Sequence, residues 1–175
     1  MFAAFGEEAG FCDWVGRLGG QATLAAPTRR GGWSGAVLIY LRANLLLEPS
    51  RKAEFRATVD AARRQGAILT VELPDAAWIR ARGPQAAYEL AEIHPDVVFA
   101  AEDVAAELGV PLEGIAPIAV TRLAAGGCTV HGRRLLGPSG VAQDSDALAA
   151  TFCVALVEGE APVEAAGRAV LAAAR

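Results

Sequence analysis

The sequence predicts an α/β protein, a three-layer αβα sandwich built around a mostly parallel β-sheet. Short apolar runs, such as residues 36–41 and 68–73, are typical of strands that are buried on both faces. Stretches with helical periodicity separate these runs, and glycine or proline stands at many of the boundaries. Strands that alternate with helices of this length form βαβ units, in which the strands are parallel and the crossovers right-handed.

The elements follow from this pattern in chain order. The first strand is expected at 36–41, and the helix after it places Phe55, Val59 and Ala62 on one face. Gly66 suits the left-handed cap at the end of that helix. Further strands are expected at 68–73, 96–100, 118–123 and 128–131, the last two as a hairpin. Further helices are expected at 76–80, 85–93, 103–108, from 144 onward and at 162–174.

Composition narrows the class of protein. The 175 residues include 16 basic and 20 acidic side chains, a net charge of −4, and 53% are hydrophobic. Such a chain is neither disordered nor a disulfide-stapled miniprotein, and we expect one domain over residues 1–175. A nucleic-acid partner is not expected, because binding phosphates requires a basic face.

The cysteines and the apolar runs bear on the compartment. Cys12, Cys128 and Cys153 are an odd number without CxxC spacing, and with only two histidines no zinc ligand set can be assigned. Reduced, buried thiols in a cytoplasmic protein are the preferred interpretation. The first residues lack the features of a signal peptide, and no apolar run is long enough to span a bilayer, so no membrane partner is expected.

Ligands of parallel sheets bind beyond the carboxyl ends of the strands, often where the N-terminus of a helix offers free amides. Three junctions meet this description, at residues 100–103, 121–127 and 141–146. They are the candidate positions for a functional site.

Four collinear segments resemble the C-terminal part of ribokinase-like (PfkB-type) sugar and nucleoside kinases. Residues 60–73 resemble a helix and strand of that family, and 83–100 resemble a segment that ends in a buried strand. Residues 121–127 resemble its nucleotide turn, and 146–152 resemble the helix that begins with the catalytic aspartate. The resemblance runs from about residue 11 to the end. It implies a ribokinase-like fold that lacks the N-terminal strands and most of the β lid, with 11–20 near the end of that lid.

The resemblance also implies a phosphoryl-transfer site. Family members move the γ-phosphoryl of ATP, with Mg²⁺, to a substrate hydroxyl, and Asp146 takes the place of their general base. Their Gly-Ala-Gly turn, whose amides bind the phosphate, falls on Gln143, Asp144 and Ser145. No metal ligand is assigned. The residues in nucleotide-binding places are Thr121, Arg122, Ala124, Gly126 and Gly127.

Several of these positions depart from the family pattern. Both glycines of the phosphate-binding turn carry side chains, and residues 101–104 lack the Asn and the Glu of the family's Asn-x-x-Glu motif. A carboxylate at Asp144 that points into the phosphate site opposes the phosphate by about 4 kcal/mol, for unit charges about 4 Å apart at a dielectric constant of about 20. Alternatively, Asp144, Ser145 and Asp146 serve only as helix caps and partners of the helix dipole.

Three functions remain open. The favoured one is a catalytically degenerate relative that acts as a binding or assembly protein and needs no cofactor. The second is an active ATP- and Mg²⁺-dependent kinase of a sugar or nucleoside hydroxyl with Asp146 as the base. The third is a regulator that binds nucleotide without turnover. Because the resemblance leaves out the N-terminal strands, an exposed edge or apolar face is expected, covered by a second copy of the chain or by a partner protein.

Overall fold

The computed structural model describes residues 1–5, 9–24, 36–46, 49–138, 141 and 143–174. Its strands are β1 (Phe2–Phe5), β2 (Ala22–Leu24), β3 (Leu38–Arg42), β4 (Ile68–Glu72), β5 (Val97–Ala101), β6 (Ile118–Arg122), β7 (Cys128–Val130) and β8 (Arg133–Leu135). Within the described residues these eight strands form one sheet in the order β2-β1-β3-β4-β5-β6-β7-β8. The strands from β2 to β6 in that order are parallel, and β7 and β8 are antiparallel to their neighbours.

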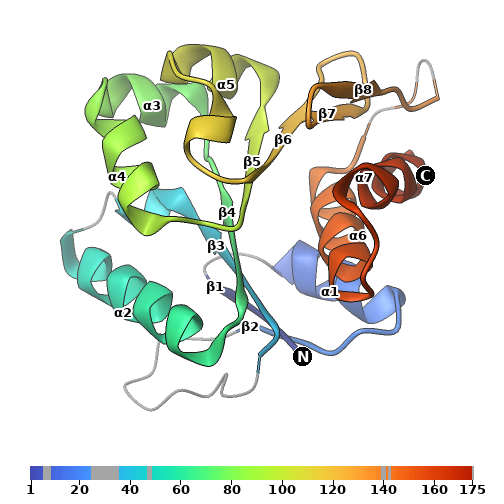
Figure 1. Ribbon diagram of the computed structural model, residues 1–175, viewed down its shortest axis with the longest axis horizontal. Coiled ribbons are helices and arrows are strands. Elements are labelled where there is room, and N and C mark those ends of the chain that lie inside the picture. The colour runs from blue at the N-terminus through green and yellow to red at the C-terminus, as the bar shows by residue number, and fades with distance from the viewer. Residues whose placement is uncertain (6–8, 25–35, 47–48, 139–140, 142, 175) are drawn as a thin grey trace.

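Helices cover both faces of this sheet. The α-helices are α1 (Ala9–Arg17), α2 (Pro49–Gln65), α3 (Ala76–Arg82), α4 (Gln85–Ile93), α5 (Glu102–Leu108), α6 (Ser145–Val157) and α7 (Pro162–Ala173), and the 3-10 helices are η1 (Ala43–Leu46) and η2 (Leu112–Gly114). Figure 1 shows α2 to α5 on one face and α1, α6 and α7 on the other. The predicted αβα sandwich with a mostly parallel sheet is confirmed.

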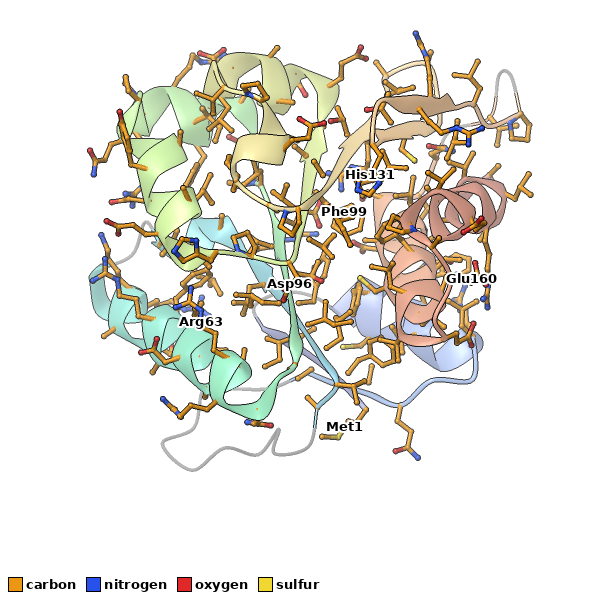
Figure 2. The ribbon with its side chains drawn as sticks, viewed as in Figure 1. Met1, Arg63, Asp96, Phe99, His131 and Glu160 are labelled. Atoms are coloured by element: carbon orange, nitrogen blue, oxygen red, sulfur yellow. The ribbon has the colours of Figure 1, made fainter. Side chains whose placement is uncertain are left out.

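The central strands are apolar because both of their faces are covered. In β3, Ile39 and Leu41 belong to the core beneath α2 to α5, while Leu38 and Tyr40 belong to the core beneath α1, α6 and α7. Phe99 of β5 points toward the second core, where its ring meets that of Phe152 edge-on at 5.4 Å (Figure 2). An uninterrupted apolar run is therefore the expected sequence of a strand at the centre of such a sheet.

The predicted helix after residue 49 is α2. Phe55, Val59 and Ala62 are all buried against the sheet, as their spacing predicts. Burying a side chain the size of Phe55 contributes roughly 1.5–3 kcal/mol relative to its exposed state. The helix ends before Gly66, whose φ of 66° is the left-handed conformation that glycine adopts without strain.

The N-terminal region differs from the sequence-based expectation. Residues 11–20, expected near the end of a β lid, form most of α1 instead, because Phe11 and Val15 are one helical turn apart and bury the same face. β1 pairs with β3 and β2 pairs with β1, so the chain's own first strands extend the sheet at the side where an open edge was expected. The outermost strand there is β2.

One further detail was not predicted. The hairpin of β6 and β7 continues into β8, whose Arg133 and Arg134 are exposed and carry no apolar signal of a strand. Among the described residues, no helix combines the length and apolar character needed to cross a bilayer. The glycines at residues 31–32 and 137–140 favour loops, but residues 31–32 and 139–140 lie outside the described part of the chain.

Candidate functional site

The three candidate junctions meet at one end of the sheet, where the parallel strands have their carboxyl ends. The carboxyl ends of β4 and β5 lead into α3 and α5 at the top of Figure 1. The strand register places Arg42 beside Glu72 and Ala101 beside Arg122, and because Glu72 pairs with Phe99, β5 and β6 extend two residues beyond β3 and β4. The N-terminus of α6 faces the same region, because Arg42 contacts Asp146 there.

Asp144 closes the N-terminus of α6. Its Oδ1 accepts hydrogen bonds from the backbone amides of Asp146 at 2.9 Å and Ala147 at 3.0 Å. Its Oδ2 accepts a third from the indole Nε1 of Trp14 at 3.1 Å, which ties α1 to α6. The family resemblance places the phosphate-binding turn at Gln143, Asp144 and Ser145, directly before these two backbone amides. In this chain a carboxylate of its own occupies them, so the cap interpretation of Asp144 is confirmed.

Gln143 makes a similar contact with the turn at residues 121–127, which the resemblance assigns to a nucleotide. Its side-chain Oε1 accepts the backbone amide of Gly127 at 2.7 Å, and its Nε2 donates to the carbonyl of Val170 in α7 at 3.4 Å. Gly127 has a φ of 106°, and a Cβ there would lie 2.1 Å from the carbonyl oxygen of Leu135. Only glycine fits this approach of the turn to β8.

The junction at residues 100–103 is also held by a hydrogen bond within the chain. The carboxylate of Glu102, at the start of α5, accepts the backbone amide of Ala124 at 3.2 Å. Glu102 therefore links two of the three junctions. Together with the bonds of Gln143 and Asp144, four backbone amides at this end of the sheet are bound by side chains of the same chain.

Asp146 is enclosed by α1 and β3. Its Oδ1 lies 3.5 Å from Nη2 of Arg42, and its side chain is 28% exposed. On the other side, the backbone of α1 approaches so closely that a Cβ on Gly10 would lie 2.1 Å from Oδ2 of Asp146. The carboxylate that the resemblance makes a general base is thus paired with a guanidinium and covered in part by a helix.

A buried polar group lies beneath this region. Glu72 is 5% exposed, accepts a hydrogen bond from the hydroxyl of Tyr40, and forms an ion pair with Nη1 of Arg122 at 2.6 Å. Burial raises the pKa of the Glu72 carboxyl, Arg122 opposes that shift, and the negative charge of Asp146 adds to it. Glu72 is therefore a carboxyl group that gains a proton more readily than an exposed one.

The structure brings the predicted residues into two groups. Gln143 joins the 141–146 junction to the turn that holds Ala124, Gly126 and Gly127. Thr121 and Arg122 end β6, but the side chain of Arg122 turns toward Glu72. Ser145 and Arg122 both line a cavity of about 660 Å³ beside α3.

The sequence analysis did not select Tyr40, Arg42 or Glu72. A signal was present for two of them, since Arg42 and Glu72 are charged residues placed directly at the ends of buried apolar strands. Charged side chains at the carboxyl ends of parallel strands are candidates for binding ligands. Within the described residues, no group of three or more His, Cys, Asp or Glu side chains is placed to hold a metal ion.

The comparisons with known proteins concern the fold. No protein-family model matches the sequence, and no curated protein matches it significantly. Adenosine kinase from Sinorhizobium meliloti superposes with a TM-score of 0.67 and 20% identity, over 79% of this chain and 48% of that chain. A PfkB protein from Polaromonas sp. JS666 superposes with a TM-score of 0.62 and 21% identity, over 80% and 53%.

A third solved structure was determined with ligands. Aminoimidazole riboside kinase from Salmonella enterica, complexed with aminoimidazole riboside and an ATP analog, superposes with a TM-score of 0.63 and 11% identity, over 78% of this chain and 55% of that chain. The chain therefore has the ribokinase-like fold that its motifs predict. It spans about half the length of these kinases.

Proposed function

We propose that this chain is a catalytically degenerate protein of the ribokinase-like fold that acts by binding or assembly. The observation that carries the proposal is the position of the Asp144 carboxylate on the amides of Asp146 and Ala147. In a kinase of this fold, the turn that receives the transferring phosphoryl group falls on residues 143–145, directly before these two amides. Here the donors are used, and a phosphate approaching them meets a negative charge in place of free N–H groups.

The size of this effect favours loss of activity. Two unit charges about 4 Å apart at a dielectric constant of about 20 repel by about 4 kcal/mol, which opposes a phosphate and its transition state alike. The backbone amide of Gly127 also donates a hydrogen bond to Gln143, and the amide of Ala124 donates one to Glu102. As they stand, these residues do not fit the phosphates of ATP, so no catalytic step is assigned to a bound nucleotide.

Calorimetry with ATP and Mg²⁺, together with a phosphoryl-transfer assay over sugars and nucleosides, tests this function. We expect neither binding nor turnover by the wild-type chain. In the Asp144→Ala variant the two amides of α6 are released, so binding of inorganic phosphate is expected to strengthen. Turnover by the wild-type chain that is abolished in Asp146→Asn would overturn the proposal.

An active kinase is the second candidate. The position of Asp146 at the N-terminus of α6, close to the cavity beside α3, favours it. In that case ATP and Mg²⁺ supply the phosphoryl group and Asp146 accepts the proton of a sugar or nucleoside hydroxyl. Binding of ATP without turnover in the same experiment would instead favour a nucleotide-binding regulator.

The binding partner that we propose is a second copy of the chain or another protein at the outer edge of β2. In the described part of the chain, β2 pairs only with β1, so its other edge offers backbone groups for pairing. We place the protein in the cytoplasm, because Cys128 and Cys153 are buried and form no disulfide among the described residues.

A further inference from the structure

The cavity beside α3 has the size of a small-molecule site. Its volume is about 660 Å³, and such sites typically measure roughly 300–1,000 Å³. It lies at the carboxyl ends of β3, β4 and β6, and its polar lining includes Arg42, Glu72 and Arg122. Its apolar lining includes Ala77 and Ala81 on α3. One end of the cavity is thus charged, and one wall is apolar.

Hydrogen-bond donors predominate at the charged end. A guanidinium carries several N–H donors and no acceptor, and two guanidiniums line this cavity. The carboxylates that face it are already engaged. Glu72 binds Tyr40 and Arg122, and Asp75 caps α3 by accepting the amide of Trp78 at 2.8 Å. A ligand that supplies acceptors suits this lining better than one that supplies donors.

The charges limit what kind of acceptor fits. Arg42 forms an ion pair with Asp146 at 3.5 Å, and Arg122 with Glu72 at 2.6 Å, so these four groups together are close to neutral, and Asp75 adds one negative charge to the lining. The Arg42 side chain is 34% exposed and lines the cavity, so a ligand in the cavity can reach its guanidinium. A single added negative charge is tolerated here better than the several charges of a polyphosphate.

We propose that this cavity binds a small organic monoanion whose carboxylate is held by Arg42 and Arg122, with its carbon body against Ala77 and Ala81. The planar fork of a guanidinium matches a carboxylate in a bidentate contact. Ser145 and Asn44, which also line the cavity, can bind hydroxyl groups on the ligand. This proposal does not depend on the closed phosphate site, because none of the four occupied amides is needed for it.

Calorimetric titration of the full chain tests the proposal with defined probes. Sodium lactate, sodium gluconate and sodium benzoate present one carboxylate on bodies of different polarity, and glucose is a neutral counterpart. At matched ionic strength, we expect saturable binding of at least one of the three carboxylates and none of glucose. In Arg42→Gln its affinity should fall by at least roughly tenfold, because a charge-assisted hydrogen bond is lost. Arg56→Gln on α2, which is 63% exposed and lies outside the cavity, is the matched control and should bind as the wild type does.

A second pair of variants keeps the test independent of Arg42. Ala81 is exposed on α3, and both glutamate and glutamine are good helix formers there. Ala81→Glu places a carboxylate at the cavity and should abolish binding of the probe, while Ala81→Gln should retain more of it. The proposal is overturned if no carboxylate binds at millimolar concentration, if inorganic phosphate binds and the carboxylates do not, or if Arg42→Gln and Ala81→Glu bind as their controls do. A nucleotide titration of the same samples reports separately on the phosphate site.

Discussion

At the scale of single residues, the carboxylate of Asp144 forms three hydrogen bonds, two to amides of α6 and one to the indole of Trp14. Aspartate is a common N-cap residue, and its negative charge also repels an anion that approaches the N-terminus of the helix. Its neighbour Gln143 binds the amide of Gly127. In a region whose sequence resembles a phosphate site, these backbone amides therefore form hydrogen bonds with side chains of the same chain.

Replacing Asp144 tests how much its cap stabilises the protein. Asp144→Ala removes the acceptor of two helix amides and of Trp14, so the free energy of unfolding should fall by about 1–2 kcal/mol. Asp144→Asn keeps a side-chain oxygen at the cap and should lose less. Urea denaturation of the three proteins measures the difference. Equal midpoints for Asp144→Ala and wild type would contradict the assigned role.

Glu72 makes stability depend on pH in a defined direction. Its pKa is raised above the ordinary value of 4.5 in the folded state, so the folded chain binds a proton more tightly than the unfolded chain does. The resulting contribution to stability is fully present below pH 4.5 and is lost as the pH rises through the folded-state pKa. Glu72→Gln does not titrate. The free energy of unfolding of wild type minus that of Glu72→Gln should therefore decrease from about pH 4 to about pH 8, and a constant difference would count against it.

The three thiols should differ in reactivity. Burial raises the pKa of Cys128 to about 11 and that of Cys153 to about 12, so little thiolate forms at either near pH 8. Cys12 is partly exposed. With Ellman's reagent, the native protein should show one fast thiol, and the unfolded protein all three. Cys12→Ser should remove the fast phase, and a fast phase that persists would disprove this order.

At the scale of elements, α1 connects the N-terminal region to the candidate site. It packs on α6, its Phe11 ring stacks on Tyr40 at 4.2 Å, and its Gly10 backbone contacts Asp146. The apolar spacing of Phe11 and Val15 explains why these residues form a helix. α1 thus covers a carboxylate that an active site would leave open.

Two glycines of α1 provide a matched pair of variants. A Cβ at Gly10 would lie 2.1 Å from Asp146, whereas one at Gly16 would meet nothing within 4 Å. Gly10→Ala should destabilise the protein by about 1–3 kcal/mol, because Asp146 or α1 must move. Gly16→Ala should leave stability unchanged or raise it by up to about 1 kcal/mol, since alanine favours the helix. Thermal unfolding measures both, and a loss in Gly16→Ala equal to that in Gly10→Ala would refute the close contact.

At the scale of the whole molecule, a ribokinase-like sheet is kept while the chain spans about half the length of the kinases that share the fold. β1 and β2 extend the sheet beyond β3 and place its edge at a strand of three residues. Within the described residues, β2 pairs only with β1, and a strand edge with unpaired backbone groups favours association.

Light scattering tests this association. At micromolar concentration we expect a mass of at least twice that of the single chain, because pairing at β2 satisfies the backbone groups of both partners. Dilution should shift the mass toward the monomer. A monodisperse monomer over the whole range would rule out self-association and leave a different protein as the partner.

Most of the fold was predictable because it depends on local patterns. Apolar runs and helical spacing predict β3, α2, β4 and the elements after them, since a strand buried on both faces must be apolar throughout. β1 was not predicted, because a four-residue strand with two alanines has little β-propensity. β8 was missed for a related reason, since its arginines face solvent.

The candidate site was predicted only in part. Asp146, Gln143 and the turn through Gly127 were found from motif positions, and Asp144 was recognised as a residue type suited to a cap. The partners of these residues could not be found, because Trp14, Arg42 and Gly10 lie more than a hundred residues away along the chain. No local spacing relates residues that meet only through the packing of α1 and β3 against α6.

The αβα architecture and the end of the sheet where ligands can bind are evident from the amino-acid sequence, because both follow from the period and polarity of neighbouring residues. The occupied amides at that end, the burial of Glu72 beside Arg122 and the cavity with two arginines next to α3 become evident in the folded chain. Hydrogen bonds and desolvation depend on which distant groups are brought together, and folding alone brings them together.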